Sequence, residues 1–78
     1  MRSFIALQRR TAHPGGWLDC IAWARAHAKE GPPVRILTAR AGERTARVVA
    51  EVSTDGERLI TGGRVISLGQ VLKNVSAA

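Results

Sequence analysis

The sequence predicts a small α+β domain, in which an antiparallel sheet and two helices follow the order β-α-β-β-β-α. Apolar residues recur at helical spacing in two segments, residues 17–28 and 68–75. Between residues 46 and 53 they alternate with polar residues, which is typical of a strand with one buried face. Clusters of Gly and Pro separate these segments, and 78 residues suffice for a single domain.

The first 16 residues predict one strand and one loop. Residues 3–8 are a short apolar run that fits a strand, which either joins the edge of the sheet or extends as an arm. The sequence leaves both arrangements open. Residues 11–16 contain a Pro-Gly-Gly run and are predicted to be a loop. The chain ends, residues 1–2 and 77–78, are expected to fray.

Residues 17–30 predict the first helix. Its apolar residues share one side because their spacings follow the helical repeat. Asp19 stands in its first turn and Lys29 in its last, as the helix dipole favours. A Gly-Pro-Pro run at residues 31–33 then ends the helix. The residues predicted to be buried are Trp17, Cys20, Ile21, Ala24 and Ala28.

Residues 34–40 and 46–53 predict two strands, and the Asp-Gly pair at residues 55–56 predicts a two-residue hairpin to a third. This hairpin places Val52 opposite Leu59, so that apolar residues face one another.

The loop between the first two of these strands also sets a register. A loop with an odd number of residues places Ile36 opposite Val48 and Val34 opposite Ala50. A two-residue loop instead sets apolar residues opposite arginines, so we predict the odd loop.

The last part of the chain predicts a break and a short helix. Gly62-Gly63 interrupts the third strand, which residues 64–66 continue. Ser67 and Gln70 form a capping pair for a helix that reaches about residue 76. We expect both helices to cover one face of the sheet, the face that carries Val34, Ile36, Ala46, Val48, Ala50, Val52 and Leu59.

Basic residues outnumber acidic ones by twelve to six, and the formal net charge is +6. This imbalance predicts an acidic partner, either nucleic acid or an acidic patch on a host protein or nucleoprotein. The sheet face opposite the helices is predicted to carry Arg35, Leu37, Arg47, Val49, Glu51, Arg58 and Ile60. The adjoining loop adds Arg40 and Arg44, and a basic segment near the N-terminus adds Arg9 and Arg10.

These arginines have two interpretations. Guanidinium groups suit phosphates, so the face is a candidate contact surface for a nucleic-acid backbone. An ordinary solvated face, in which aliphatic residues support the arginine stems, explains the same pattern. The clustering depends on the odd loop, because an even loop would set Arg35 on the same face as Val48.

Three apolar residues are candidate anchors for a protein partner: Trp23, Leu37 and Ile60. Trp23 falls off the predicted buried side of its helix, beside His27. A half-exposed Trp is a common anchor in interfaces and a platform for stacking bases. Alternatively, Trp23 closes the edge of the core beneath the N-terminal strand.

The residues that enzymes use for catalysis form no recognisable set in this chain. Cys20 and His27 lie about 10 Å apart along one helix, too far for a thiolate–imidazole pair. One Cys and two His give no metal-ligand spacing, and no cofactor motif is present. We therefore predict a binding protein and not an enzyme.

Two functions fit these features. The first is a small basic protein that associates with nucleic acid, with little base specificity. The alternative is a protein-binding inhibitor or adaptor from a phage or mobile element, of the anti-CRISPR or antitoxin kind. The arginine-rich composition fits a bacterial or phage coding bias. A homodimer paired through a sheet edge or through Trp23 is a third hypothesis, and a cytoplasmic location without membrane contact is expected.

Overall fold

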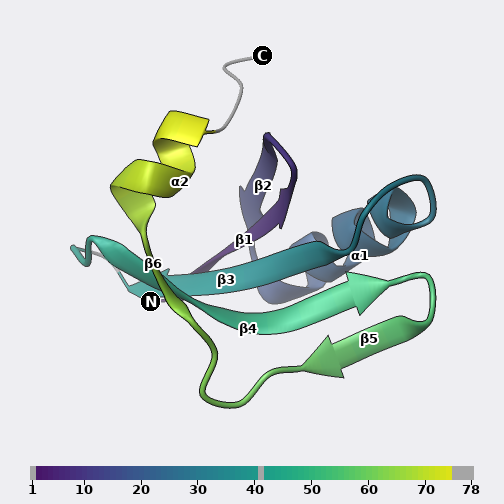
Figure 1. The fold of residues 1–78 in the computed structure, drawn as a ribbon. Coiled ribbons are helices and arrows are strands. Elements are labelled where there is room, and N and C mark those ends of the chain that lie inside the picture. The colour runs from purple at the N-terminus through teal and green to yellow at the C-terminus, as the bar shows by residue number, and fades with distance from the viewer. Residues whose placement is uncertain (1, 41, 75–78) are drawn as a thin grey trace.

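A computed structural model describes residues 2–40 and 42–74 and confirms the predicted fold class and element order (Figure 1). Five strands lie side by side in the order β2-β1-β3-β4-β5, and a sixth, β6, pairs with the beginning of β4. The strands are β1 (Arg2–Gln8), β2 (Thr11–Gly15), β3 (Val34–Arg40), β4 (Thr45–Ser53), β5 (Gly56–Leu59) and β6 (Val65–Ser67). The helices are α1 (Trp17–Ala28) and α2 (Leu68–Asn74).

Strand β1 joins the sheet between β2 and β3 and is not an extended arm. It pairs antiparallel with both neighbours, from Arg2 opposite Arg40 to Leu7 opposite Arg35 on the β3 side. Arg2 is therefore part of the sheet, although it was expected to fray. Residues 1, 77 and 78, and the predicted end of the second helix at residues 75–76, lie outside the described residues.

The prediction of a loop at residues 11–16 is wrong, because residues 11–15 form the edge strand β2. A two-residue turn at Arg9 and Arg10 brings β2 back along β1, with Gln8 opposite Thr11. Pro14 has no N–H to donate, and an edge strand tolerates this because one of its sides lacks a partner. The Pro-Gly signal therefore marked a strand edge and not an irregular segment.

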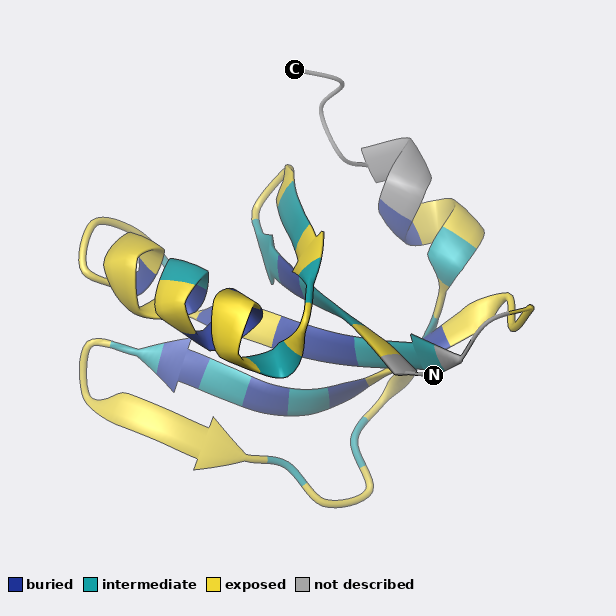
Figure 2. Ribbon diagram, turned by 180° about the vertical axis from the view of Figure 1, so that it is seen from behind, coloured by how far each residue is buried: buried dark blue, intermediate teal, exposed yellow. Residues whose placement is uncertain are grey.

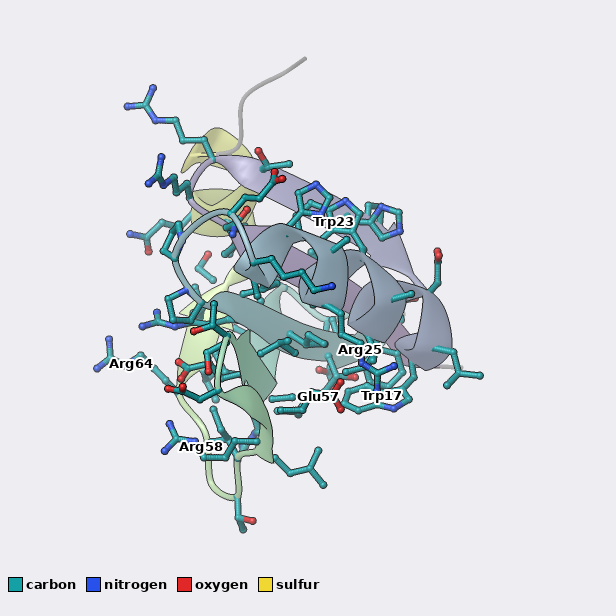
Figure 3. All side chains as sticks on the ribbon, turned by 90° about the vertical axis from the view of Figure 1, so that its right-hand side faces the viewer. Trp17, Trp23, Arg25, Glu57, Arg58 and Arg64 are labelled. Carbon is teal, nitrogen blue, oxygen red and sulfur yellow. The ribbon has the colours of Figure 1, made fainter. Side chains whose placement is uncertain are left out.

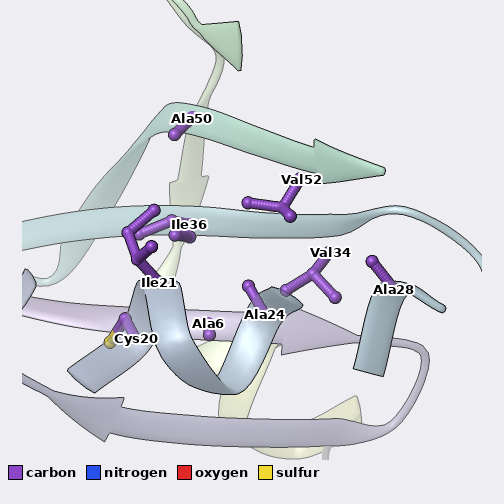
Figure 4. Close-up of a cluster of buried hydrophobic side chains, with 9 residues drawn as sticks. All are labelled: Ala6, Cys20, Ile21, Ala24, Ala28, Val34, Ile36, Ala50 and Val52. Carbon is purple, nitrogen blue, oxygen red and sulfur yellow. The ribbon is translucent and has the colours of Figure 1, made fainter. Parts of the chain in front are cut away.

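Helix α1 lies across β1, β3 and β4 and buries four of the five side chains that its periodicity predicts, whereas Trp17 is only half-buried (Figure 2). Three of its buried residues are small, which lets the helix approach the sheet closely. Phe4 and Trp17 close one border of this cluster, with their rings in edge contact at 5.3 Å. Figure 4 shows its members: Ala6, Cys20, Ile21, Ala24, Ala28, Val34, Ile36, Ala50 and Val52.

A β-bulge at Val49 divides the apolar residues of β3 and β4 between the two faces of the sheet. Ile36 pairs with Ala50, but the next residue, Leu37, pairs with Val48. Since adjacent residues of a strand point to opposite faces, the pair of Leu37 and Val48 faces away from α1. The prediction of an odd loop is therefore wrong. The apolar residues of β4 alternate without a break along the sequence, but the face of the sheet that they occupy changes at the bulge.

The helices pack against different clusters, so the expectation that they share one face is corrected. The second cluster contains Leu37, Ala46 and Val48, and Leu68 at the beginning of α2 packs against it. Gly63 makes this arrangement possible, because a Cβ there would lie 2.0 Å from the Val48 carbonyl oxygen. The chain crosses β4 at this point, and the amide of Val48 donates to the Arg64 carbonyl.

The turn of the β4–β5 hairpin lies one residue earlier than predicted, so the pairing of the two strands shifts by two residues. Ser53 pairs with Gly56 and Ala50 with Leu59, so the turn is Thr54-Asp55. The Ser53 hydroxyl accepts a hydrogen bond from the Asp55 amide at 3.3 Å, which stabilises this turn. The shift preserves which face each residue occupies, but Leu59 is 75% exposed and is not in the core.

Candidate anion-binding face

Four arginines gather on the side of the sheet away from α1, which we call the arginine face. Arg35 comes from β3, Arg58 from β5, Arg9 from the β1–β2 turn and Arg64 from the segment before β6. All four are exposed, and they surround a half-buried carboxylate, Glu51. Figure 3 shows Arg58 and Arg64 projecting on this side, opposite Trp23.

Three adjoining hollows make the arginine face continuous. Leu7 and Arg9 line both a hollow of about 380 Å³ beside α2 and another of about 360 Å³ beside the prolines at residues 32–33. Arg35 continues the second hollow into a third, of about 220 Å³, which Arg64 also lines. The floor of these hollows is aliphatic, and its residues are Leu7, Val48, Ile60, Ile66 and Val71.

Glu51 holds two of the arginines in place. Its carboxylate accepts a hydrogen bond from the Arg58 guanidinium at 3.5 Å and lies 4.0 Å from Arg35 Nε. Strand pairing produces this contact, because Arg35 and Arg58 each stand directly opposite Glu51 on neighbouring strands. Two guanidinium groups thus lie near one carboxylate, and among the described residues Glu51 is the acidic residue that lines the hollows of Arg9, Arg35 and Arg64.

Arg9 has an unusual backbone conformation for an arginine. Its φ of 53° lies in the left-handed region, and it is the non-glycine residue with positive φ among those described. The first position of a two-residue hairpin turn with positive φ ordinarily favours glycine. The conformation places the Arg9 side chain at the border of two of the hollows.

The structure gathers only part of the predicted arginine cluster. Arg47 lies beyond the bulge and lines a separate hollow with Thr38 and Glu43. Arg44 is exposed in the β3–β4 turn, where its carbonyl accepts from the Leu68 amide. Arg40 ends β3, and its side chain is outside the described part of the structure.

Arg10 belongs to the predicted arginine cluster, whereas Arg64 does not. Arg10 is exposed at the β1–β2 turn. Arg64 was missed, because nothing in the sequence indicates that Gly62-Gly63 turns the chain back across β4.

Acidic residues limit the arginine face at the β4–β5 hairpin. Asp55 and Glu57 lie there beside Arg58. Glu57 is paired with Arg25 of α1, and this hydrogen bond lowers the pKa of the Glu57 carboxyl. The basic surface therefore extends from Arg58 toward Arg9 and Arg64, away from the hairpin.

The three candidate anchors differ in their accessibility. Leu37 is only 1% exposed, so its side chain is not available to a partner. Ile60 is half-buried in the floor of the arginine face. Trp23 is half-buried on the other side of the sheet. Its ring stacks between those of His27 and His13, with centroid distances of 3.8 Å and 5.5 Å.

The Trp23 stack is held by polar contacts at both ends. His13 Nε2 lies 3.1 Å from an Asp19 carboxylate oxygen, and His27 Nδ1 donates to the Trp23 carbonyl at 2.8 Å. These contacts fit the interpretation of Trp23 as the closing residue of the core edge.

Cys20 is buried, and its thiol donates to the His13 carbonyl at 3.5 Å. Burial raises the pKa of this thiol, so the neutral form is favoured and nucleophilic reactivity is low. Among residues 2–40 and 42–74, no three His, Cys, Asp or Glu side chains are placed to hold a metal ion together.

Comparisons of the chain with protein-family models, curated proteins and solved structures give no match. Neither described helix is long and apolar enough to cross a membrane.

Proposed function

We propose that this protein binds nucleic acid through the phosphate backbone, and that the arginine face is the contact surface. The observation that carries the proposal is that Arg9, Arg35 and Arg64 line adjoining hollows on one side of the sheet, with Arg58 beside them next to Glu51. Guanidinium groups bind phosphate oxygens in pairs of hydrogen bonds, and each neutralised phosphate releases counterions. Surface charge alone would not require the arginines to share one face.

Two details of the face support this proposal. Arg35 and Arg58 both lie within 4.0 Å of the Glu51 carboxylate, and a phosphate group offers the same kind of acceptor. Arg9 adopts a conformation that glycine would adopt at lower cost. Strained residues of this kind gather at functional sites.

The test is the salt dependence of binding to a labelled nucleic acid, measured by fluorescence anisotropy. Four phosphate contacts give a slope of log Kobs against log salt of about −3 to −4. Absence of binding to any DNA or RNA at low salt would overturn the proposal, and so would an affinity that does not change with salt.

A second candidate is a protein partner with an acidic patch, and one observation favours it. Val65 is 51% exposed beside Arg64 and lines the hollow next to α2. Apolar residues next to arginines are typical of protein interfaces. Affinity capture from a nuclease-treated bacterial lysate separates the two candidates. One stoichiometric protein that survives nuclease treatment supports the second, whereas loss of all partners supports the first.

A further inference from the structure

The aromatic residues and the arginine face lie on opposite sides of the sheet. The chain has two Trp, one Phe and no Tyr. Phe4 and Trp17 are in contact beside α1, and Trp23 lies on α1 against the same cluster. Figure 3 shows Trp17 and Trp23 on the helix side and Arg58 and Arg64 on the other. The arginine face therefore has no aromatic side chain at all.

This separation decides which form of nucleic acid the face can hold. Proteins that bind single strands combine basic side chains with aromatic rings on which the unpaired bases stack. A duplex keeps its bases stacked on one another and presents its phosphates outward. A surface with arginines and no rings is suited to the second form and lacks the stacking contribution to affinity for the first.

The floor of the face also offers few groups that read base edges. Leu7, Ile60 and Ile66 are half-buried aliphatic residues that neither donate nor accept hydrogen bonds through their side chains. The polar side chains that line these hollows are Glu51, Ser67, Gln70 and the guanidinium groups, which can reach phosphates.

We infer that the arginine face takes a double-stranded nucleic acid, held by its phosphates and not by its bases. This inference rests on the proposed function and adds the class of nucleic acid to it. It predicts that duplex binding leaves Trp17 and Trp23 undisturbed, because both lie across the sheet from the bound backbone.

The experiment compares four labelled probes of equal length: a DNA duplex, an RNA duplex, and single strands of oligo-dT and oligo-U. Anisotropy at low salt should give duplex affinities at least ~10-fold above those of the single strands. Tryptophan emission, corrected for absorption by the nucleic acid, should stay constant on duplex binding. Trp23→Phe should leave duplex affinity within about 2-fold of wild type, since the ring lies outside the proposed contact surface.

Two results would overturn the inference while the proposed function stands. One is single-strand affinity equal to or above duplex affinity. The other is quenching of tryptophan emission by the bound strand, with a loss of affinity in Trp23→Phe. Failure of all four probes to bind would instead remove the proposed function itself.

Discussion

Glu51 accepts a hydrogen bond from Arg58 across the β4–β5 pair, at 3.5 Å, and its carboxylate also lies 4.0 Å from Arg35 Nε across the β3–β4 pair. A bound phosphate must compete with this carboxylate for both Arg58 and Arg35. Glu51 therefore limits the affinity of the face for polyanions.

Glu51→Gln should strengthen nucleic-acid binding by about 3- to 10-fold at low salt, because it removes a negative charge and releases two guanidinium groups. Stability should change by less than about 1 kcal/mol, since the pairs are largely solvated. Anisotropy and chemical denaturation measure the two quantities. Weaker binding by the variant would show that Glu51 organises the arginines and does not compete with the ligand.

Arg9→Gly should raise the stability of the protein and lower its affinity for nucleic acid. Glycine suits a φ of 53°, so the free energy of unfolding should rise by about 0.5–1 kcal/mol. Nucleic-acid affinity should fall, because one arginine leaves the face. Arg10→Gly, at the next position of the same turn, is the matched control and should not stabilise the protein, because Arg10 has no positive φ. A loss of stability in Arg9→Gly would contradict the account of this turn.

Gly63→Ala should destabilise the protein by about 1–3 kcal/mol or more, because the new Cβ meets the Val48 carbonyl oxygen at the bulge. Gly69→Ala is the matched control. Its Cβ would have ordinary contact with the Ser67 hydroxyl at 3.7 Å, and alanine favours the helix α2. Urea denaturation of both variants measures the difference, and equal stabilities would contradict the close crossing at Val48.

The Cys20 thiol should make stability depend on pH in the alkaline range. Burial raises the pKa of the thiol in the folded protein. The neutral thiol therefore makes its full contribution to the free energy of unfolding at any pH below the pKa of the unfolded thiol, about 8.5. As pH rises further, the unfolded chain releases its proton first, and stability falls until the folded thiol also ionises. Relative to Cys20→Ala, the wild type should lose stability above about pH 8.5. If the free energies of unfolding of the two proteins change with pH in the same way, burial does not raise the pKa of this thiol.

The helix and strand segments could be predicted because their patterns are local. Cys20, Ile21, Ala24 and Ala28 follow the helical repeat, and all four are buried. Strand β3 begins and ends at the predicted residues, since Pro33 precedes it and Gly42, which has a positive φ, lies just beyond its end.

The change of face within β4 could not be predicted, because it depends on contacts between distant residues. Ala46, Val48, Ala50 and Val52 alternate without a break, yet the bulge turns the first two away from α1. The segment that covers them returns through Gly63, fifteen residues after Val48. A pattern within one strand has no signal for such a crossing.

The same bulge explains why only part of the predicted arginine cluster lies on one face. Arg35 and Arg58 share a face with Glu51, as the alternation of their strands indicates. The bulge moves Arg47 to the other side, and the β1–β2 turn and the crossing before β6 bring Arg9 and Arg64 in its place. The location of the arginines thus follows from strand pairing, and the turn residues of the sequence predict only part of that pairing.

The measurement that tests the binding face most directly compares two variants with equal charge. Arg35, Arg58 and Arg64 are changed to Gln in one variant, and Arg10, Arg25 and Arg47 in the other; all six side chains are exposed. The salt dependence of duplex binding should lose about 2–3 units of slope in the first variant and less than about one in the second. Equal losses in the two variants would show that net charge, and not the arginine face, binds nucleic acid.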